Sequence, residues 1–382
     1  MLIISHQANL SGAPRALLNI FPYLKSTFDI YVILNNDGKA AKEFNTLGKT
    51  FLFYGDKKRK IKSALYLSGI YSFLKRIWFK RILKNLDPEL IYINTMAKNI
   101  PSAIALLSNK PTIINFHETD FTIAYYPDKQ WVQTITNSNA HFIGCAVYVS
   151  NFLKESCGIP ANRISTIYET IDVNALRSKP LTGKFRTIHN IPDDVKLIGC
   201  SGAPQFRKGT DIFIKAAIIT LQKEINYYFV WLGGSNSVTS VDSYSKSCMK
   251  MISDNNAEKY IHLIPEILNP EEFYSTIDLF IIPSREDPFP LSMLEAMAFE
   301  KPVVGFYTSG IPEALTNNNG VLVEGLNSEK LSDSIISILK DEVNYKNIQK
   351  NAYKRVSEEY NSPVIAPQLE RLILKLMQVE II

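Results

Sequence analysis

The segment "LFIIPSREDPFPLSMLEAMA" (residues 279–298) predicts a strand, a loop and the start of a helix. Four apolar residues open it, as in a strand that is buried on both faces. Pro283 and Pro290 bracket the loop, and a proline at that point presets the backbone for the first turn of a helix. Acids just before a helix complement its dipole. Glu295 lies inside the helix among apolar neighbours, so it needs another explanation.

The same unit recurs along the chain. Short apolar runs rich in Ile, Val, Phe and Tyr alternate with helix-length segments, which indicates βαβ units and parallel sheets buried on both faces. In the first half the runs lie at 2–6, 30–35, 50–55, 90–95, 112–118, 142–149 and 164–171. They resume at 195–203, 227–234, 261–266, 279–286, 302–310 and 320–325. We therefore predict an α/β protein with two doubly wound, Rossmann-like domains facing an interdomain cleft.

The domain boundaries follow from where the alternation lapses. We place the N-terminal domain at residues 1–176 and the C-terminal domain at 195–359. The segment 177–194 contains Pro, Gly and charge without sustained periodicity, so we interpret it as a linker.

Composition favours a globular protein of the cytoplasm. The 382 residues are 46% hydrophobic and 21% charged, with a mild net charge of +5. The four cysteines lie far apart and form no CxxC pair, which argues against a disulfide framework or a thiolate zinc site and for a reducing compartment. The N-terminus lacks the pattern of a signal peptide, and no apolar run is long enough to cross a membrane.

In open α/β sheets ligands bind beyond the carboxyl ends of the strands. Arg207 and Lys208 follow a strand there and suit a bound phosphate, although a solvated surface pair is the alternative. The helix beginning near Leu291 offers unpaired N–H groups that form an anion site. A diphosphate could rest between these groups, with Glu295 accepting hydrogen bonds from a ribose and Asp287 from a second sugar.

Several of these segments resemble one known family. Asp287, seven further residues and Glu295 resemble the E-x7-E signature of retaining glycosyltransferases with the GT-B fold, specifically glycosyltransferase family four. The next residues, "AMAFEKPVVGFYTSGIPEAL" (296–315), also resemble that family. "FRKG" (206–209) is similar to its diphosphate loop and "SGAPRALLNI" (11–20) to its first glycine loop, while "YETID" (168–172) stands where the family often has Asn-Gly-x-Asp. The resemblance implies a GT-B architecture, with a final helix at 360–382 packed on the N-terminal, acceptor-side domain.

Two positions depart from the family pattern. Asp287 stands where Glu is usual, and Glu286 is adjacent, so either acid contacts the donor sugar; Asp287 keeps the spacing. Ala203 stands where Arg is usual. Either Arg207 supplies that cation from a different point of the backbone, or binding of the diphosphate is weak.

The resemblance also assigns a role to His117, which follows a strand of the first domain. A lone histidine is commonly structural, but family members often carry one here, near the donor sugar, where it orients a hydroxyl and offsets positive charge at the anomeric carbon. Gly12 would let a ligand approach the backbone closely. His6 is either catalytic or a cap of its strand. Glu313 is interpreted as a helix-start acid.

The expected site residues follow. The resemblance implies catalytic roles for His117, Asp287, Arg207 and Lys208. It implies donor binding by Gly12, Gly202, Arg207, Lys208, Glu286, Phe289, Pro290, Leu291 and Glu295. We expect no cofactor and no metal, because cations and a helix terminus would offset the diphosphate charge and the sequence has no Asp-x-Asp pair.

The implied reaction transfers a sugar, with retention, from a nucleotide-diphosphate donor (a UDP-sugar is favoured) to a hydroxyl of a glycan or lipid-linked glycan during surface polysaccharide or glycoconjugate assembly. Two alternatives stay open: a nucleotide-sugar epimerase, and a non-catalytic nucleotide-sugar-binding subunit of a transferase. A dinucleotide-dependent dehydrogenase has little support, because no GxGxxG follows the first strand.

Residues 57–84 contain ten Lys or Arg and no acid. They predict a basic amphipathic helix that lies on an anionic membrane, which would place the protein peripherally on the inner face of the cell membrane. The other interpretation is a core-facing helix with a solvated face. No motif supports a nucleic-acid partner. The apolar stripe comprises Ile70, Phe73, Leu74, Ile77 and Trp78, and the basic stripe Arg76, Lys80 and Lys84.

Overall fold

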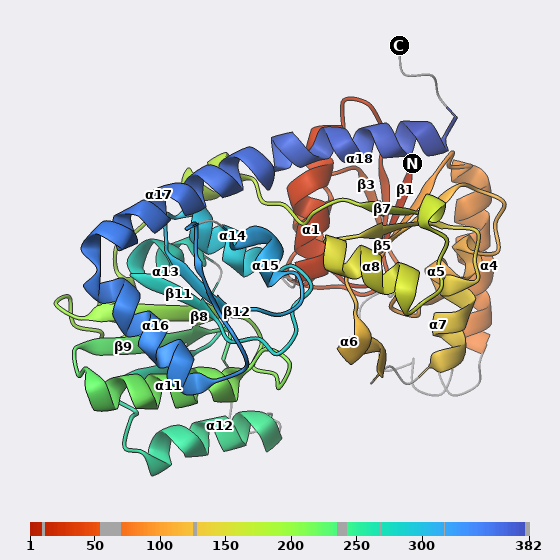
Figure 1. Cartoon of the computed structure of the whole chain (residues 1–382). Coiled ribbons are helices and arrows are strands. Elements are labelled where there is room, and N and C mark those ends of the chain that lie inside the picture. The colour runs from red at the N-terminus through yellow and green to blue at the C-terminus, as the bar shows by residue number, and fades with distance from the viewer. Residues whose placement is uncertain are drawn as a thin grey trace. The chain divides into compact units, whose positions relative to one another are not determined.

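The computed structural model describes residues 1–9, 12–53, 70–124, 128–234, 243–267, 269–316 and 318–378. The chain forms two compact units. The first comprises Met1–Thr170 and Ser362–Ile382, and the second comprises Ile171–Asn361. Each contains a parallel sheet with helices on both of its faces (Figure 1). The predicted fold class, two Rossmann-like domains, is confirmed.

Seven described strands form the sheet of the first unit, in the order β3-β2-β1-β4-β5-β6-β7, and all neighbours are parallel. All residues of β1 and β4 are buried, which explains why these strands are apolar up to their last residues, Ser5 and Asn94, rather than alternating. The strands are β1 (Leu2–Ser5), β2 (Tyr31–Leu34), β3 (Lys49–Leu52), β4 (Ile91–Asn94), β5 (Thr112–Phe116), β6 (His141–Gly144) and β7 (Ile164–Thr166).

The helices of the first unit include the last helix of the chain. The apolar side chains of α1, η1 and α18 share one core with the sheet, in which Leu17, Phe21, Leu369 and Ile373 are buried. The run at 142–149 holds both β6 and the start of α8. The helices are α1 (Gly12–Ile20), η1 (Phe21–Leu24), α2 (Ala41–Phe44), α4 (Ile70–Leu86), α5 (Ile100–Ala105), α6 (Asp120–Ala124), α7 (Lys129–Thr136), α8 (Val147–Glu155), η2 (Ala161–Arg163) and α18 (Ser362–Leu376).

The second unit has six described strands in the order β10-β9-β8-β11-β12-β13, again all parallel. Its strands are β8 (Lys196–Ser201), β9 (Tyr227–Leu232), β10 (Ile261–Ile264), β11 (Leu279–Ile282), β12 (Val303–Phe306) and β13 (Val321–Val323). Every apolar run predicted as a strand, in either half, therefore overlaps a strand of the structure.

Helices α11, α12 and α16 share a core with one face of this sheet, through Phe213, Cys248 and Ile335. Helix α13 packs closely on β8, because a Cβ added at Gly199 would lie 2.5 Å from the Phe273 ring. The helices are α9 (Val173–Arg177), α10 (Phe185–Ile188), α11 (Thr210–Lys223), α12 (Ser243–Asp254), α13 (Glu271–Thr276), α14 (Leu291–Ala298), α15 (Ile311–Ala314), α16 (Ser328–Lys340) and α17 (Glu342–Glu359).

The segment interpreted as a linker, 177–194, lies inside the second unit and packs there. Phe185 is buried with its ring 5.8 Å from that of Phe273. The Glu272 carboxylate accepts hydrogen bonds from the backbone N–H groups of Thr182 and Gly183. One aromatic anchor and one capped turn fix the segment, and its helix α10 is only four residues long, which is too short to give a helical periodicity in the sequence. The chain passes from one unit to the other at 170/171 and at 361/362.

The sequence predicted no membrane-spanning helix and one basic amphipathic helix at 57–84. None of the described helices is both long and apolar enough to cross a bilayer. Residues 57–69 of the predicted basic helix lie outside the described residues, and the remainder belongs to α4.

Truncating Leu369 tests the contribution of α18 to the first unit. We expect Leu369→Ala to lower the opening free energy of that unit by about 2–5 kcal/mol, because it removes a buried side chain from the shared core. Hydrogen–deuterium exchange resolved by peptide measures this: peptides from β1 and α1 would exchange faster, and peptides from β9 would not. Arg371→Ala, at an exposed position of the same helix, is the control. Equal acceleration in both units would contradict the assignment of α18.

Candidate active site

The strand order of the second unit reverses between β8 and β11, and ligands of doubly wound sheets bind at such a point. The loop after β8 carries Arg207 and Lys208, and the loop after β11 carries Glu286 and Asp287. The two loops are joined directly, since the backbone N–H of Arg285 donates to the Arg207 carbonyl at 2.8 Å. The cationic and acidic loops singled out in the sequence are therefore neighbours.

Both cations converge on one carboxylate. Lys208 forms an ion pair with Asp287, and Arg207 Nη1 lies 3.7 Å from Asp287 Oδ1. Arg207 also donates to the Glu286 carbonyl at 2.7 Å. Asp287 is only 5% exposed, and Lys208 and Arg207 offset its buried charge. Ala203 is exposed and brings no charge, which leaves Arg207 as the second cation of this loop.

Two glycines shape these loops. Gly202 has φ +139°, a backbone region that side chains rarely adopt, and its carbonyl accepts a 2.7 Å hydrogen bond from Trp231 Nε1. A Cβ at Gly209 would lie 1.9 Å from the Pro283 carbonyl oxygen, so glycine is what allows α11 to begin against the end of β11. A small pocket lies beside the loops, lined in part by Ser201, Lys208, Trp231, Ser284, Asp287 and Ser292.

Helix α14 begins at Leu291, after Pro290 in an extended conformation. In its second turn, Glu295 Oε2 accepts a 2.6 Å hydrogen bond from the Tyr274 hydroxyl, which lies 2.9 Å from Ser201 Oγ. The carboxylate predicted to bind a ribose is thus held in place by a buried tyrosine. Phe289 is buried and packs 5.1 Å from the Tyr360 ring, so its side chain is a packing element; a donor contact by Phe289 stays a prediction.

The acidic loop is clamped to the start of α11. Arg285 forms two hydrogen bonds of 2.8 and 2.7 Å with the Asp211 carboxylate and stacks 3.7 Å from the Phe206 ring. The Tyr244 hydroxyl also donates to Asp211 at 2.7 Å. Burial alone would raise the pKa of Asp211, but Arg285 and Tyr244 hold it below the ordinary value.

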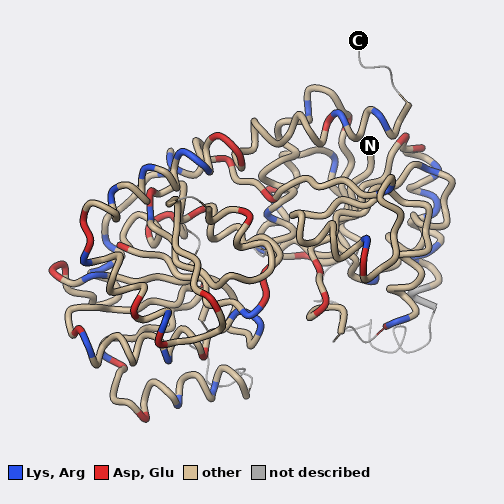
Figure 2. Tube along the Cα trace, in the orientation of Figure 1, with Lys and Arg blue, Asp and Glu red and all other residues tan. Residues whose placement is uncertain are grey.

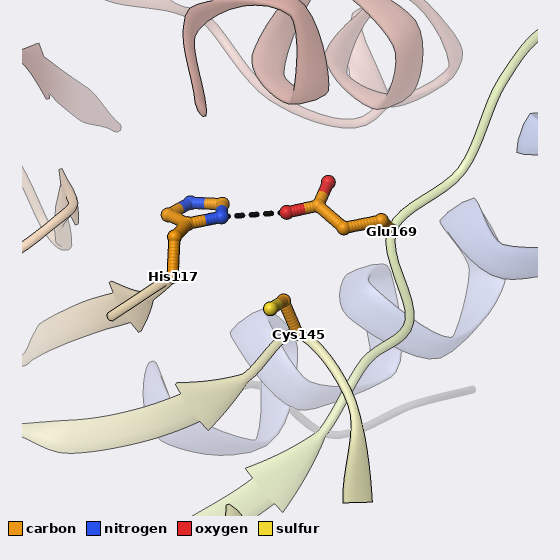
Figure 3. A group of neighbouring side chains, drawn as sticks. All are labelled: His117, Cys145 and Glu169. Atoms are coloured by element: carbon orange, nitrogen blue, oxygen red, sulfur yellow. Dashed lines mark ion pairs between the residues drawn. The ribbon is translucent and has the colours of Figure 1, made fainter. Parts of the chain in front are cut away.

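In the first unit the strand order reverses between β1 and β4, and a polar group lies at the ends of the neighbouring strands. His117 follows β5, and its Nε2 lies 2.9 Å from Asn94 Oδ1 at the end of β4. Its Nδ1 lies 2.5 Å from Glu169 Oε1, with the Cys145 thiol close by (Figure 3). Asn94 Nδ2 donates to the Ala13 carbonyl at 2.7 Å. His117 is thereby connected to the glycine loop, where Gly12 begins α1.

The pKa values of the two histidines of this site are shifted in opposite directions. Burial would lower the pKa of His117, but Glu169 and then Glu118 raise it above the ordinary value of 6.5. Burial, together with the charge of His117, lowers the pKa of His6 to about 4, so His6 is neutral near neutral pH. Thr95, beside this site, has φ +88°, a strained conformation for a β-branched residue.

Three further positions singled out in the sequence are Gly12, Glu286 and Glu313. A Cβ at Gly12 would meet no described atom within 4 Å, so the space in front of it is open among the described residues. Glu286 is buried in the acidic loop. Glu313 lies in the first turn of α15, where a helix-start acid is expected.

Sequence reasoning missed Asn94, Glu169, Asp211 and Tyr274. Asn94 ends a predicted strand and could have been found by the rule that selects residues after apolar runs. Glu169 was noticed only as part of the family motif. Nothing in the sequence indicates that Tyr274, a buried residue of α13, reaches the next helix.

Comparison with known proteins agrees with the fold and the motifs. Residues 10–175 match the family model described as Glycosyltransferase Family 4, and residues 182–355 match the model of Glycosyl transferases group 1. The structure is similar to that of HepE from Anabaena in complex with UDP-glucose, with a TM-score of 0.81 at 18% identity over 98% of this chain and 99% of that one. The fold is thus that of the GT-B glycosyltransferases.

The chain belongs to glycosyltransferase family four. Among curated relatives, it is 25% identical to an alpha-galactosylglucosyldiacylglycerol synthase from Streptococcus pneumoniae, over 61% of this chain and 60% of the relative. It is 23% identical to an N,N'-diacetylbacillosaminyl-diphospho-undecaprenol alpha-1,3-N-acetylgalactosaminyltransferase from Campylobacter jejuni, over 92% of this chain and 84% of the relative. The chain spans only about half the length of most curated relatives it matches, such as 47% of the capsular polysaccharide glycosyltransferase CapM from Staphylococcus aureus.

Replacing Arg285 tests the clamp. We expect Arg285→Ala to destabilise the second unit by about 3 kcal/mol at pH 7, because Asp211 would keep a largely buried charge without its main partner. The pKa of Asp211 is depressed in the folded protein, so the pair stabilises above the unfolded pKa and the difference from wild type should shrink as pH falls below about 4.

Chemical denaturation at several pH values measures this difference. Lys250→Ala, which breaks an exposed pair with Asp254, is the control and should change stability by less than about 1 kcal/mol. Equal losses in the two variants would contradict a structural role for the clamp.

Proposed function

We propose that the protein is a retaining glycosyltransferase that moves a sugar from a nucleotide-diphosphate donor to a hydroxyl group of a glycan or lipid-linked glycan. A UDP-sugar is the favoured donor. The observation that carries the proposal is the convergence of Arg207, Lys208 and Asp287 beside the first turn of α14, at the reversal point of the second sheet.

The proposed complex uses these groups as follows. The diphosphate rests against Arg207, Lys208 and the N–H groups that begin α14, and these offset the negative charge it gains as the glycosidic bond breaks. Glu295, oriented by Tyr274, accepts hydrogen bonds from the ribose, and the acids at 286 and 287 face the donor sugar. The relatives support this class of reaction, since HepE binds UDP-glucose in its crystal structure.

The first unit would serve the acceptor and the transferred sugar. We place His117 near the sugar, as the family resemblance implies, and Gly12 where the backbone admits a ligand. The Campylobacter and Streptococcus relatives bear names of enzymes that act on lipid-linked glycans and glycolipids, which favours an acceptor of that class. Cations and a helix terminus would serve in place of a metal, so we expect transfer to proceed without one.

Two substitutions test the donor site. We expect Lys208→Ala to lower kcat about 10²–10³-fold, the usual cost of removing one group that stabilises transition-state charge. We expect Glu295→Ala to abolish the thermal shift given by UDP. Lys223→Ala, at an exposed lysine of α11 that pairs with Asp333, is the matched control.

The measurements are a thermal-shift screen of UDP, GDP, dTDP and CDP sugars and a transfer assay containing EDTA. Unchanged UDP binding in Glu295→Ala would overturn the placement of the donor. Conversion of the donor to an epimer without acceptor would identify an isomerase, and donor binding without turnover would identify a non-catalytic subunit.

We also propose that α4 lies on an anionic membrane surface. Its side chains Phe73 and Leu74 are 62% and 55% exposed, and Trp78 is 39% exposed. These apolar side chains are therefore not buried in the core. Exposed basic residues follow along the same helix, which Figure 2 shows as blue segments. Aromatic and aliphatic side chains beside lysine and arginine suit the interface of an anionic bilayer. Only Phe79 and Lys75 among the described positions 73–80 are buried.

Vesicle flotation tests this surface. The triple variant with Arg76, Lys80 and Lys84 changed to Glu should no longer float with vesicles rich in phosphatidylglycerol, because each basic residue contributes about 1 kcal/mol near such a surface. The control makes the same charge change at exposed lysines of α12, α16 and α17, namely Lys250, Lys340 and Lys346, and should float like wild type. Equal flotation of both triple variants would defeat the proposal.

A further inference from the structure

We propose that Glu169 is a positioning residue that keeps the His117 ring protonated on both nitrogens, so that the ring acts as a hydrogen-bond donor and not as a base. The inference rests on the proposed placement of His117 near the transferred sugar. It concerns a contact specific to this chain, because the family often has asparagine at the position of Glu169.

The first proton is fixed by Asn94. The amide nitrogen of Asn94 donates to the Ala13 carbonyl, which can only accept, so the amide oxygen is the atom that faces His117. That oxygen lies 2.9 Å from His117 Nε2. Since an amide oxygen has no proton to give, Nε2 must carry one.

The second proton is fixed by Glu169. Its Oε1 lies 2.5 Å from His117 Nδ1, and two bare acceptors at that separation would repel each other. A proton therefore lies between them. An imidazole nitrogen binds a proton more tightly than a carboxylate does, so the proton lies on the ring. The result is an imidazolium beside a carboxylate, joined by a strong, charge-assisted hydrogen bond.

The same distance bears on the Cys145 thiol, which completes a group of three side chains of metal-ligating type (Figure 3). Two ligands of a tetrahedral zinc ion lie about 3.3 Å apart, given bonds of about 2.0–2.1 Å. The 2.5 Å gap between His117 and Glu169 accommodates a proton and is too short to hold a metal ion between the two atoms. We therefore interpret His117 and Glu169 as a pair joined by a hydrogen bond and not as two ligands of one metal ion.

The surroundings favour the cation. The titratable groups that face the His117–Glu169 pair come from the ends of β1, β5 and β6 and from β4 itself: His6, Glu118, Cys145 and Tyr92. Glu118 is held by the backbone N–H groups of Met96 and His117 and adds negative charge. Burial raises the pKa of Tyr92 far above neutrality, so it is uncharged, and His6 is neutral because its pKa is about 4. The raised pKa of His117 agrees with this balance.

A doubly protonated ring changes what His117 can do. It has no lone pair with which to accept a proton, and its charge opposes rather than offsets positive charge at the anomeric carbon. The Nε2–H can donate to one acceptor at a time: Asn94 Oδ1 in this structure, or a sugar hydroxyl oxygen in the proposed complex. Glu169 thus fixes the donor direction of the ring.

Nuclear magnetic resonance of the protein labelled with ring-¹⁵N histidine tests the inference without any assay of transfer. The chain has five histidines, and the spectrum of His117→Gln assigns the signal of His117. We expect both ring nitrogens of His117 to be protonated at pH 7 in wild type. In Glu169→Gln, burial is no longer opposed by the carboxylate, so the ring should titrate at lower pH and be singly protonated at pH 7.

Two controls accompany the measurement. Glu118→Gln removes a nearby charge that does not contact the ring, and it should lower the pKa of His117 less than Glu169→Gln does. His141, whose Nε2 lies 2.9 Å from Ser165 Oγ, should titrate alike in every variant. An unprotonated Nδ1 in wild type, or identical His117 spectra in wild type and Glu169→Gln, would overturn the inference.

Turnover gives a second readout. We expect Glu169→Gln to lower kcat about 100-fold with little change in KM for the donor, because a slight misplacement of a positioned group has that cost. Activity that needs the protonated ring falls as pH rises through the folded pKa of His117, so the alkaline limb of the profile should move to lower pH in Glu169→Gln and return in Glu169→Asp. An unmoved limb would count against Glu169. Failure of wild type to transfer any sugar would overturn the proposed function and leave the spectra standing.

Discussion

The site residues depend on one constraint: within each sheet all described strands run in the same direction. Every strand of a sheet therefore releases its chain at the same edge, and the loops that follow β8 and β11, or β1, β4 and β5, are forced to meet there. The reversal of strand order opens this edge, because the connections on its two sides lead away in opposite directions. Residues as distant as Arg207 and Asp287 become neighbours through this geometry rather than through any local signal.

Buried charge at these edges is held by specific partners. Asp287 is paired with two cations, and Asp211 is paired with Arg285. Glu295 accepts a hydrogen bond from the hydroxyl of Tyr274. Each carboxylate would be costly to bury alone, and each partner also sets the direction in which the carboxylate points. The same contacts that stabilise the loops therefore define the geometry of the candidate site.

The sequence predicted the sheets well because a strand covered on both faces must be apolar throughout, and such runs are easily recognised. It predicted the loops Arg207–Lys208 and Glu286–Asp287 because they follow those runs directly. It could not predict the roles of Tyr274 and Glu169. Tyr274 contacts Glu295 on the next helix and Glu169 contacts His117 from a segment distant in the sequence, and neither contact produces a periodic pattern. The segment 177–194 was interpreted as a linker for a related reason, since Phe185 packs on α13 through a contact that leaves no periodic pattern in the sequence.

The two neighbouring histidines of the first unit respond oppositely to the same surroundings. Burial leaves His6 without charge down to about pH 4, whereas carboxylates hold His117 charged beyond 6.5. The pKa values of the two rings therefore lie on opposite sides of the ordinary value of 6.5, near which an isolated histidine is most responsive. Mild acidification near that value therefore changes the charge of these two rings less than it would change the charge of two exposed histidines.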